Sequence, residues 1–349
     1  MNILEKFKVL MAENKIDAYI VPTSDYHLSE YTANYFKTRA FLSGFSGSAG
    51  TLLVIRKKAY LWTDGRYFIQ AQKEIEEFGI KLMKMGSKDK SLEDFLSDNL
   101  KEGDTLGFDG KTMPTTLFLN INKKLSGVNY VFDKDLVDSV WNKRPKLPSN
   151  KIYTLPLSLT GLSRTSKIAL VREKLKEKDV SYFVLSALED IAWLFNMRGS
   201  DIKNTPVFLA YAVITNKEVN LFLNKESLNK EATELLYKDK INVIDYNYFY
   251  TFLKDIKKET VLIDKNKTNY LTYSTLKENN SLLLEENITL LLKAKKNKIE
   301  IENTKKAHFN DGLVMTKFMY YLKHNSPPRT PRRFALHREK TKQYYKLII

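Results

Sequence analysis

An arginine in a tight turn is the first residue whose surroundings suggest binding chemistry. The segment reads Trp62-Thr63-Asp64-Gly65-Arg66-Tyr67-Phe68, and its Asp-Gly pair supplies the backbone freedom that a tight turn needs. Such a turn would present Arg66 beside three aromatic side chains. The planar guanidinium group can bind a carboxylate or a backbone carbonyl. The spacing alone fits a plain surface arginine equally well.

A glycine-rich segment lies shortly before this turn. It reads Gly44-Phe45-Ser46-Gly47-Ser48-Ala49-Gly50-Thr51, with glycines three residues apart. It lacks the GxGxxG spacing of dinucleotide-binding loops and the Lys-Ser/Thr pair of a P-loop. We therefore interpret the segment as a turn that leads tightly into a strand, in preference to a phosphate-binding loop.

The residue types give little support to thiol or metal chemistry. The chain has no cysteine, which excludes disulfides, thiolate zinc sites and cysteine nucleophiles. The histidines follow no ligand spacing such as HExxH, and no carboxylates with metal-loop spacing accompany them. Each is expected to be a surface or hydrogen-bonded residue. The four histidines are His27, His308, His324 and His337.

Several carboxylates near apolar segments invite an acid–base interpretation, but a structural role fits them better. They are Asp17, Asp25, Glu189 and Asp190. The pair Glu189-Asp190 directly precedes the apolar run 191–194, as expected for acidic residues in the first turn of a helix. We expect all four to serve in turns or at helix starts.

The elements that must position these residues follow from the apolar pattern. Ile3, Leu4, Phe7, Leu10 and Met11 form one stripe of a helix. An apolar strand follows at 18–21 and ends at Pro22, which cannot donate a ladder hydrogen bond. Residues 51–55 and 59–62 then predict a hairpin around the charged turn 56–58.

The same order of elements recurs about 164 residues later. A helix face is marked by Ile168, Val171 and Leu175, with Ser166 as its expected N-cap. Strands are predicted at 182–185, 207–214 and 219–223, with a polar turn between the last two. We interpret this order as two copies of one α/β unit. Chance recurrence of common elements is the alternative.

Composition suggests where one unit ends and the next begins. The first domain is expected at 1–140, a polar linker with two prolines at 141–150, and the second domain at 151–292. Residues 293–325 predict a long charged helix that opens a third unit. Residues 326–349 form a basic tail with four arginines and three lysines against one glutamate. The tail marks a compositional break, and its three prolines predict few core contacts.

Charge and hydropathy narrow the class of protein. The 349 residues carry 57 Lys and Arg against 41 Asp and Glu, a formal charge of +16. The 43% hydrophobic content is sufficient for folded cores. Nucleic-acid binding is disfavoured because no aromatic residues interleave with the basic ones. The longest clear apolar run, 207–214, is too short to span a bilayer, and the charged N-terminus does not fit a signal peptide. We expect no membrane contact and a cytoplasmic location.

Two groups of residues resemble a known family. The first group is 41–51 together with 61–68, which contains Arg66. The second is 187–201 together with 204–208. They are similar to the first and second domains of aminopeptidase P, the Xaa-Pro aminopeptidases, and the similarity extends over about residues 1–325. The segment 300–312 resembles the entry into the family's third domain.

The resemblance implies both a fold and an activity. The fold would be α/β: two related creatinase/prolidase N-terminal-type domains, each a mixed sheet flanked by helices, followed by the first helix of a truncated pita-bread catalytic domain. The activity would be removal of an N-terminal residue that precedes proline, by a hydroxide bridging two manganese ions. The resemblance places the five metal ligands beyond position 325, so we expect no metal in this chain and no catalysis by it alone.

Two residues are carried over from the resemblance. Arg66 matches an arginine that contacts the peptide, and His308 matches a histidine that binds the substrate. The implied partners are peptides with proline at the second position and further copies of the chain in a homo-oligomer such as a dimer. A non-catalytic reading stays open, in which two creatinase-type domains act as an oligomerisation or peptide-binding module.

Overall fold

The chain begins with an α/β domain whose sheet has six strands. A computed structural model describes residues 2–325, and its secondary structure opens with the predicted helix α1 (Ile3–Glu13) and strand β1 (Ala18–Pro22). The predicted hairpin is formed by β2 (Thr51–Ile55) and β3 (Lys58–Thr63). The other strands are β4 (Lys81–Lys84), β5 (Thr105–Phe108) and β6 (Asn129–Val131). Strand order is β4-β3-β2-β1-β5-β6.

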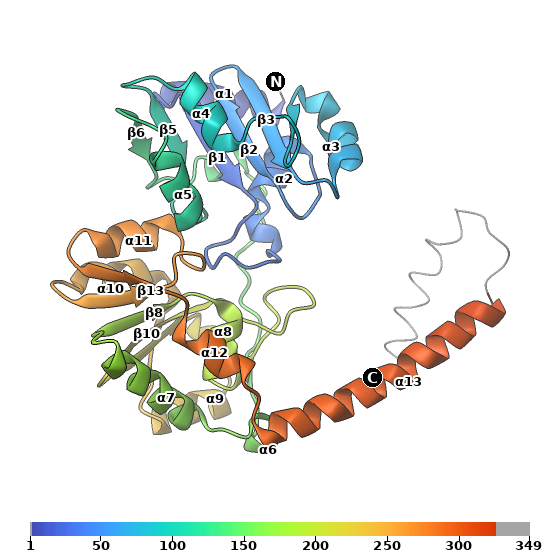
Figure 1. Cartoon of the computed structure of the whole chain (residues 1–349), viewed down its shortest axis with the longest axis vertical. Helices are drawn as coiled ribbons and strands as arrows, with labels where there is room; N and C mark the ends of the chain where they lie inside the picture. Colours follow the sequence, from blue (N-terminus) through green and yellow to red (C-terminus); the bar gives the residue numbers. More distant parts are fainter. Residues whose placement is uncertain (1, 326–349) are drawn as a thin grey trace. The chain divides into compact units, whose positions relative to one another are not determined.

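Helices cover both faces of this sheet (Figure 1). They are α1, α2 (Thr38–Ser43), α3 (Phe68–Ile75), α4 (Leu92–Asn99) and α5 (Thr115–Asn122), with short 3-10 turns at Asn34–Phe36, Glu76–Phe78 and Asp138–Val140. Alternation along β1 explains why both faces are buried. Tyr19 and Val21 pack with α1 and α3, whereas Ala18 and Ile20 pack with α4 and α5.

The second domain repeats this sheet. Its strands are β8 (Tyr182–Leu185), β10 (Ala210–Thr215), β11 (Val219–Leu223), β12 (Asn242–Asp245), β13 (Thr260–Ile263) and β14 (Ser281–Leu284). Their order is β12-β11-β10-β8-β13-β14. Each neighbouring pair of strands has the same relative direction as its counterpart in the first domain. β10 is antiparallel to both of its neighbours, β11 and β8, and the remaining pairs, β12 with β11, β8 with β13 and β13 with β14, are parallel. The expected duplication of one α/β unit is confirmed in strand order and direction.

The second domain contains the two helices predicted around 168–175 and 189–194 and four further ones. They are α7 (Arg164–Glu177), α8 (Leu188–Leu194), α9 (Lys230–Lys238), α10 (Phe249–Asp255), α11 (Tyr270–Lys277) and α12 (Ile288–Ala294), with 3-10 turns at Lys225–Ser227 and Tyr246–Tyr248. A two-stranded ribbon joins β7 (Tyr153–Thr154) and β9 (Met197–Arg198). The prediction of Ser166 as N-cap is wrong, because α7 begins at Arg164. Ser166 therefore lies inside the helix, and the side chain of Arg164 at its start is buried and pairs with Asp239 (2.7 Å).

The two domains meet where equivalent segments cross. After β5 and after β13, an aspartate turn leads into a helix, and the turns pair antiparallel at Pro114 and Asn269. The amide of Thr115 donates to the carbonyl of Thr268 (3.2 Å), and the amide of Tyr270 donates to the carbonyl of Met113 (2.8 Å). Thr115 and Tyr270 occupy equivalent positions in the two domains, as do Met113 and Thr268, so each domain donates the same hydrogen bond to the other. The duplicated unit is therefore joined to itself through a local pseudo-twofold contact.

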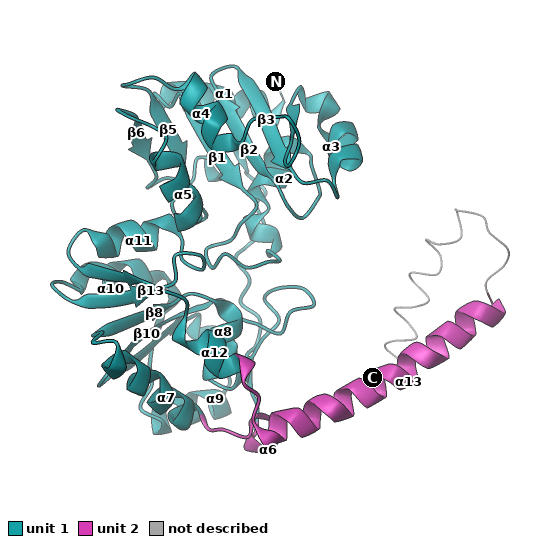
Figure 2. Cartoon of the chain, viewed as in Figure 1, with its two compact units in different colours: residues 1–155, 164–293 teal, residues 156–163, 294–349 magenta. Residues whose placement is uncertain are grey.

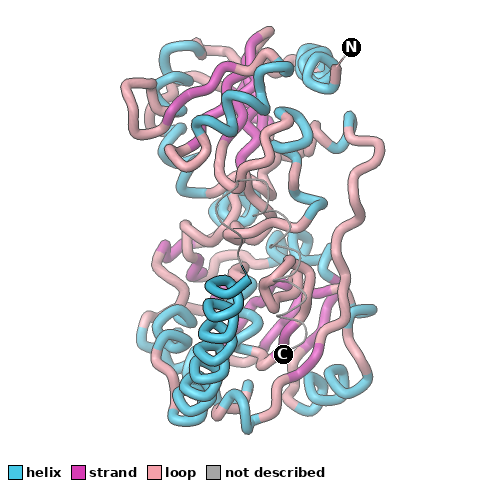
Figure 3. The backbone as a smooth tube through the Cα atoms, turned by 90° about the vertical axis from the view of Figure 1, so that its right-hand side faces the viewer, coloured by secondary structure: helices cyan, strands magenta, loops and turns pink. Residues whose placement is uncertain are grey.

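By the density of its contacts the chain divides into two compact units (Figure 2). The first comprises 1–155 and 164–293 and contains both α/β domains. The second contains α6 (Leu157–Thr160) and the predicted long helix, α13 (Lys298–Asn325), which Figure 3 draws as one continuous cyan coil. None of the α13 residues is buried. The basic tail at 326–349, with its predicted lack of core contacts, lies outside the described residues.

Candidate functional site

Arg66 lies in the turn that follows β3, as the Asp-Gly pair predicted. The amide of Tyr67 donates to the carbonyl of Asp64 (3.0 Å), which closes the turn. The guanidinium of Arg66 binds the Asp64 carboxylate through Nε (2.9 Å) and Nη2 (2.8 Å), and it lies over the ring of Tyr67 at 5.2 Å. The Arg66 side chain is 68% exposed. A cationic fork is thus held at the surface in one orientation.

The ion pair is stable over the whole physiological pH range. Hydrogen bonds from Arg66 lower the pKa of Asp64 to about 2, and the same contact raises the pKa of the guanidinium. A ligand carboxylate that approaches Arg66 must therefore share the guanidinium with the Asp64 carboxylate or displace that carboxylate. A neutral peptide carbonyl can bind without displacing any charge.

The glycine-rich segment lies against this turn. Ser48 Oγ and the Tyr67 hydroxyl are 2.7 Å apart, and the rings of Phe45 and Tyr67 meet edge to face at 5.7 Å. A Cβ atom on Gly47 would lie 2.3 Å from the Phe45 ring and 2.8 Å from that of Tyr67, so only glycine fits there. The segment also leaves α2 through Gly44 at a φ of 70°. Its interpretation as a turn leading into a strand is confirmed.

Arg39 is the residue that the sequence analysis missed at this site. It lies in α2, is 4% exposed, and donates Nη1 to the Phe45 carbonyl (2.6 Å) and Nε to Thr23 Oγ1 (2.8 Å). Nη2 donates to the carbonyl of Gly47. One buried guanidinium thus fixes two carbonyls of the glycine-rich loop. The sequence around Arg39 contains no motif that predicts a buried arginine, since its neighbours Thr38 and Ala40 occur in many kinds of segment.

His308 lies on α13, in the second compact unit, and its side chain is exposed. The imidazole of His308 makes no hydrogen bond or ion pair with other side chains or carbonyls among residues 2–325. Arg66 belongs to the first unit, so the two predicted site residues lie in different compact units. The assignments of both as substrate-binding residues stay predictions.

The carboxylates expected in structural roles have them. Asp25 Oδ1 accepts the amides of His27 (2.9 Å) and Ser29 (3.0 Å). Glu189 and Asp190 lie in the first turn of α8, as predicted. Asp190 is also buried, and it accepts hydrogen bonds from Lys293 and from Thr289 Oγ1 (2.8 Å for the latter). It therefore ties α12 to the core of the second domain.

His27 is a buried structural histidine between the two domains. Its Nδ1 lies 2.9 Å from the carbonyl oxygen of Ser186, and its Nε2 lies 2.7 Å from the Tyr246 hydroxyl. A carbonyl can only accept, so Nδ1 carries the proton and Nε2 accepts from Tyr246. Burial lowers the pKa of His27 to about 3, and the ring is neutral at pH 7.

The described residues do not form a metal site. No group of three or more histidine, aspartate or glutamate side chains within residues 2–325 is arranged to hold an ion. A two-metal centre, which needs several such ligands together, does not fit this part of the chain. None of the helices in the same range combines the length and apolar content that crossing a bilayer requires.

Comparison with known families identifies the class of protein. The creatinase/prolidase N-terminal domain family matches residues 3–140, and a second form of the same domain matches residues 143–300. The chain therefore belongs to the creatinase/prolidase N-terminal domain family and contains this domain twice.

Comparison with single proteins narrows the relationship to Xaa-Pro aminopeptidase P, to which the chain is homologous over 91% of its length. It is 35% identical to a probable Xaa-Pro aminopeptidase P of Laccaria bicolor and 34% identical to Xaa-Pro aminopeptidase 1 of Dictyostelium discoideum. The chain covers 51% and 52% of these relatives, or about half of their length.

A solved structure gives the same result. The X-prolyl aminopeptidase of Caenorhabditis elegans, described as a cytosolic enzyme with a di-nuclear active site, superposes with a TM-score of 0.86 at 30% identity. The match covers 93% of this chain and 56% of that enzyme. The fold class expected from the sequence, two creatinase-type domains followed by a helix, is confirmed.

Proposed function

We propose that this chain supplies the two N-terminal domains of an Xaa-Pro aminopeptidase and that they position peptides with proline at the second residue. The observation that carries the proposal is the fixed cationic fork of Arg66 at the surface of the first domain, within a segment that resembles the family's first domain. The homology over nearly the whole chain supports the same conclusion.

In this proposal, Arg66 and His308 orient the substrate and the hydrolytic step takes place elsewhere. Arg66 would donate a hydrogen bond to a peptide carbonyl or carboxylate, and the exposed imidazole of His308 would be a second substrate contact, each within its own compact unit. Residues 2–325 would not hydrolyse peptides alone, because they lack a set of metal ligands. Hydrolysis would require metal ligands outside residues 2–325, which the resemblance expects to hold two manganese ions.

Location and assembly form part of the proposal. A cytosolic location is supported by the Caenorhabditis elegans enzyme, which is described as cytosolic. The chain would form a homo-oligomer, and light scattering on the purified protein tests this directly. We also retain the domain boundaries at 140, 150, 292 and 325 as proposals.

The experiment is a chimera of residues 1–325 with the catalytic domain of a related enzyme. Arg66→Ala and His308→Ala would each lower kcat/KM for an Xaa-Pro peptide by about tenfold to a hundredfold, as expected when a hydrogen bond to a charged group is lost. Metal content should be unchanged. The matched control is Arg56→Ala, which removes an exposed arginine of the same domain outside the turn.

Full activity of both variants would exclude these residues as substrate contacts. A comparable loss in Arg56→Ala would indicate that the effect arises from general charge. The unmodified chain of 349 residues should show no turnover and no stoichiometric manganese; turnover with bound metal would contradict the proposal that hydrolysis lies outside it. Binding of Xaa-Pro peptides without turnover would favour the alternative, a non-catalytic peptide-binding module.

A further inference from the structure

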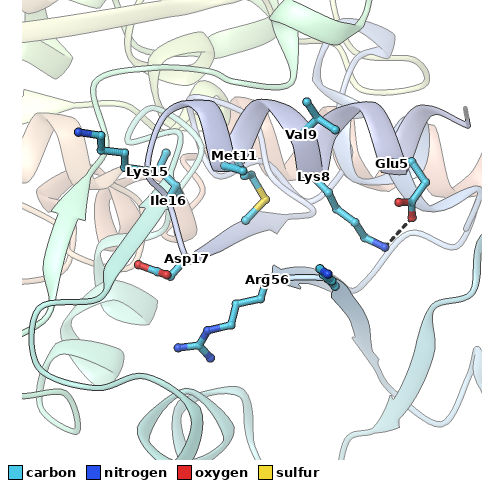
Figure 4. Close-up of a pocket in the computed structure, with 10 residues that line it drawn as sticks. Glu5, Lys8, Val9, Met11, Lys15, Ile16, Asp17 and Arg56 are labelled. Carbon is cyan, nitrogen blue, oxygen red and sulfur yellow. Dashed lines mark hydrogen bonds and ion pairs between the residues drawn. The ribbon is translucent and has the colours of Figure 1, made fainter.

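A groove beside α1 takes no part in the site described above. It lies between α1 and the two-residue loop that joins β2 to β3 and has a volume of about 650 Å³. This size is within the range of small-ligand and peptide side-chain sites. Figure 4 shows Met11 on the side of α1 that faces the loop carrying Arg56.

The lining of the groove is basic and incompletely neutralised. It includes four cations, Lys8, Lys15, Arg56 and Lys57. Lys8 binds Glu5 at 2.7 Å, and Arg56 binds Asp104 at 2.8 Å. Lys15 and Lys57 are exposed, and neither has an ion-pair partner among residues 2–325. The second carboxylate of the lining, Asp17, accepts the amide of Thr105 (2.9 Å).

Two of these cations occupy backbone positions that usually carry glycine or asparagine. Lys15 follows α1 at a φ of 57°, and Arg56 opens the hairpin loop at a φ of 49°. This left-handed conformation costs a non-glycine residue about 1 kcal/mol or more. Asp179 has a φ of 52° at the position of the second domain that is equivalent to Lys15. The fold thus requires the conformation, and the positive charge at this position is specific to the first domain.

The second domain also shows how the groove can be closed. The residue equivalent to Lys8 is Arg172, whose Nε donates to the carbonyl of Thr215 at the end of β10 (3.0 Å). Lys8 instead turns back to Glu5 on its own helix. The side chain that spans from helix to hairpin in the second domain therefore has no counterpart in the first. The space beside α1 is left open with its cations around it.

We propose that this groove binds an acidic peptide segment, with carboxylates at Lys15 and Lys57 and an apolar side chain against the exposed face of Val9. Charge complementarity supports this occupant, because the lining carries four cations against two carboxylates and the chain has a net charge of +16. Val9, which is 47% exposed, supplies an apolar contact. None of the lining residues is aromatic, so nucleic-acid bases would find no stacking platform.

The test is a binding measurement on the full chain with a short fluorescent peptide of glutamates around one leucine. The double variant Lys15→Gln/Lys57→Gln should raise Kd by about fivefold to tenfold, as expected for the loss of two charge contacts. The control Lys257→Gln/Lys267→Gln removes the same charge from exposed lysines of the second domain and should change Kd by less than about twofold. Val9→Ser should weaken binding of the leucine peptide but not of a matched peptide with serine in its place.

Four outcomes would overturn the proposal. They are absence of binding to the unmodified chain, equal weakening in both double variants, the same weakening by Val9→Ser for both peptides, and tighter binding of an oligothymidylate with the same dependence on Lys15 and Lys57. The last result would assign the groove to nucleic acid. Unchanged melting temperatures of all variants would show that the changes in Kd do not arise from unfolding.

Discussion

Arg39 is the residue on which the shape of the glycine-rich loop depends. Its guanidinium is buried and donates to two loop carbonyls and to Thr23 Oγ1. Burial lowers the pKa of Arg39 to about 10, so the group stays charged at neutral pH. The turn that carries Arg66 packs, through Tyr67, against the loop that this buried arginine fixes.

Replacement of Arg39 by alanine should destabilise the chain by about 3 kcal/mol, because it leaves buried carbonyls without donors. Arg39→Lys should recover part of that stability, since one ammonium can replace the charge but not the fork. Urea unfolding monitored by circular dichroism measures both variants. A loss for Arg39→Ala below about 1 kcal/mol would show that water replaces the guanidinium as donor.

Arg66 provides a matched arginine at the same site. Its side chain is 68% exposed, so Arg66→Ala should change the melting temperature by less than about 2 °C. Differential scanning calorimetry of Arg39→Ala and Arg66→Ala side by side tests the contrast. A large decrease for Arg66→Ala would assign it a structural role and weaken the proposal of peptide contact.

Two buried groups between the domains give opposing pH dependence. The pKa of His27 is lowered by burial to about 3, whereas burial and the nearby Asp135 raise the pKa of Asp109 to about 7. Between pH 6.5 and 3 the unfolded chain protonates His27 and the folded chain does not, so this group lowers stability as pH falls. Between pH 4 and 7 the folded chain keeps the Asp109 proton, so that group lowers stability as pH rises.

Single variants of His27 and Asp109 should separate their two contributions to the pH dependence of the free energy of unfolding. His27→Gln removes a contribution that rises by up to about 1.4 kcal/mol per pH unit between pH 4 and 6, and Asp109→Asn removes one that falls by a similar amount. The wild-type chain should therefore have a flatter profile in this range than either variant. Unfolding free energies at several pH values test this. Parallel profiles for all three proteins would contradict both pKa assignments.

At the scale of elements, the crossing of the two aspartate turns holds the duplicated domains together. Gly110 lies at this crossing, and a Cβ atom there would be 2.8 Å from the carbonyl oxygen of Phe132 and 3.3 Å from Leu271 Cβ. The carbonyl of Gly110 also accepts the Leu271 amide (2.9 Å). Small size at this position is therefore a requirement of the contact between domains.

Gly110→Ala should cost about 1 to 3 kcal/mol, because the backbone must shift to relieve the overlap. The control is Gly65→Ala, where the nearest atom is a ring carbon of Phe68 at 3.8 Å. Chemical denaturation compares them, and hydrogen exchange of the Leu271 amide reports the crossing itself. Equal stability of the two variants would show that the crossing adapts to a methyl group.

At the scale of the whole molecule, the buried core resides in one of the two compact units. All buried hydrophobic residues identified in the described chain precede residue 289, and α13 contributes none. Several apolar side chains of α13 are instead exposed, including Phe309 at 69% and Met319 at 66%. Stability of the α/β domains should therefore be independent of this helix.

A chain ending at residue 293 should fold and unfold cooperatively, because it retains the core clusters and the contact of Asp190 with Lys293. Near-ultraviolet circular dichroism and calorimetry test this. The melting temperature should lie within about 4 °C of that of the full chain. Loss of the cooperative transition would show that α13 contributes to the core.

Several helices and strands, among them α1, β1 and the hairpin of β2 and β3, were accessible from the sequence because apolar spacing is a local property. A stripe such as Leu4, Phe7 and Met11 is buried on one face wherever the helix packs, and the duplication followed from the repeated order. The N-cap at Ser166 was predicted wrongly because residue type alone does not fix the residue at which a helix begins. Local residue type suggested it, but α7 begins at Arg164, whose buried side chain pairs with the distant Asp239.

The sequence by itself determined the α/β class, the two related domains, the turn at Arg66 and the relationship to the Xaa-Pro aminopeptidases. Tertiary structure alone decided that Arg39 is buried beneath the glycine-rich loop and that His27 is neutral between Ser186 and Tyr246. Helix and strand patterns depend on neighbours a few residues apart, whereas burial of a charge depends on atoms brought together from distant segments. Desolvation of Arg39 could therefore be assigned only once the first domain was folded, and desolvation of His27 only once the two domains were folded against each other.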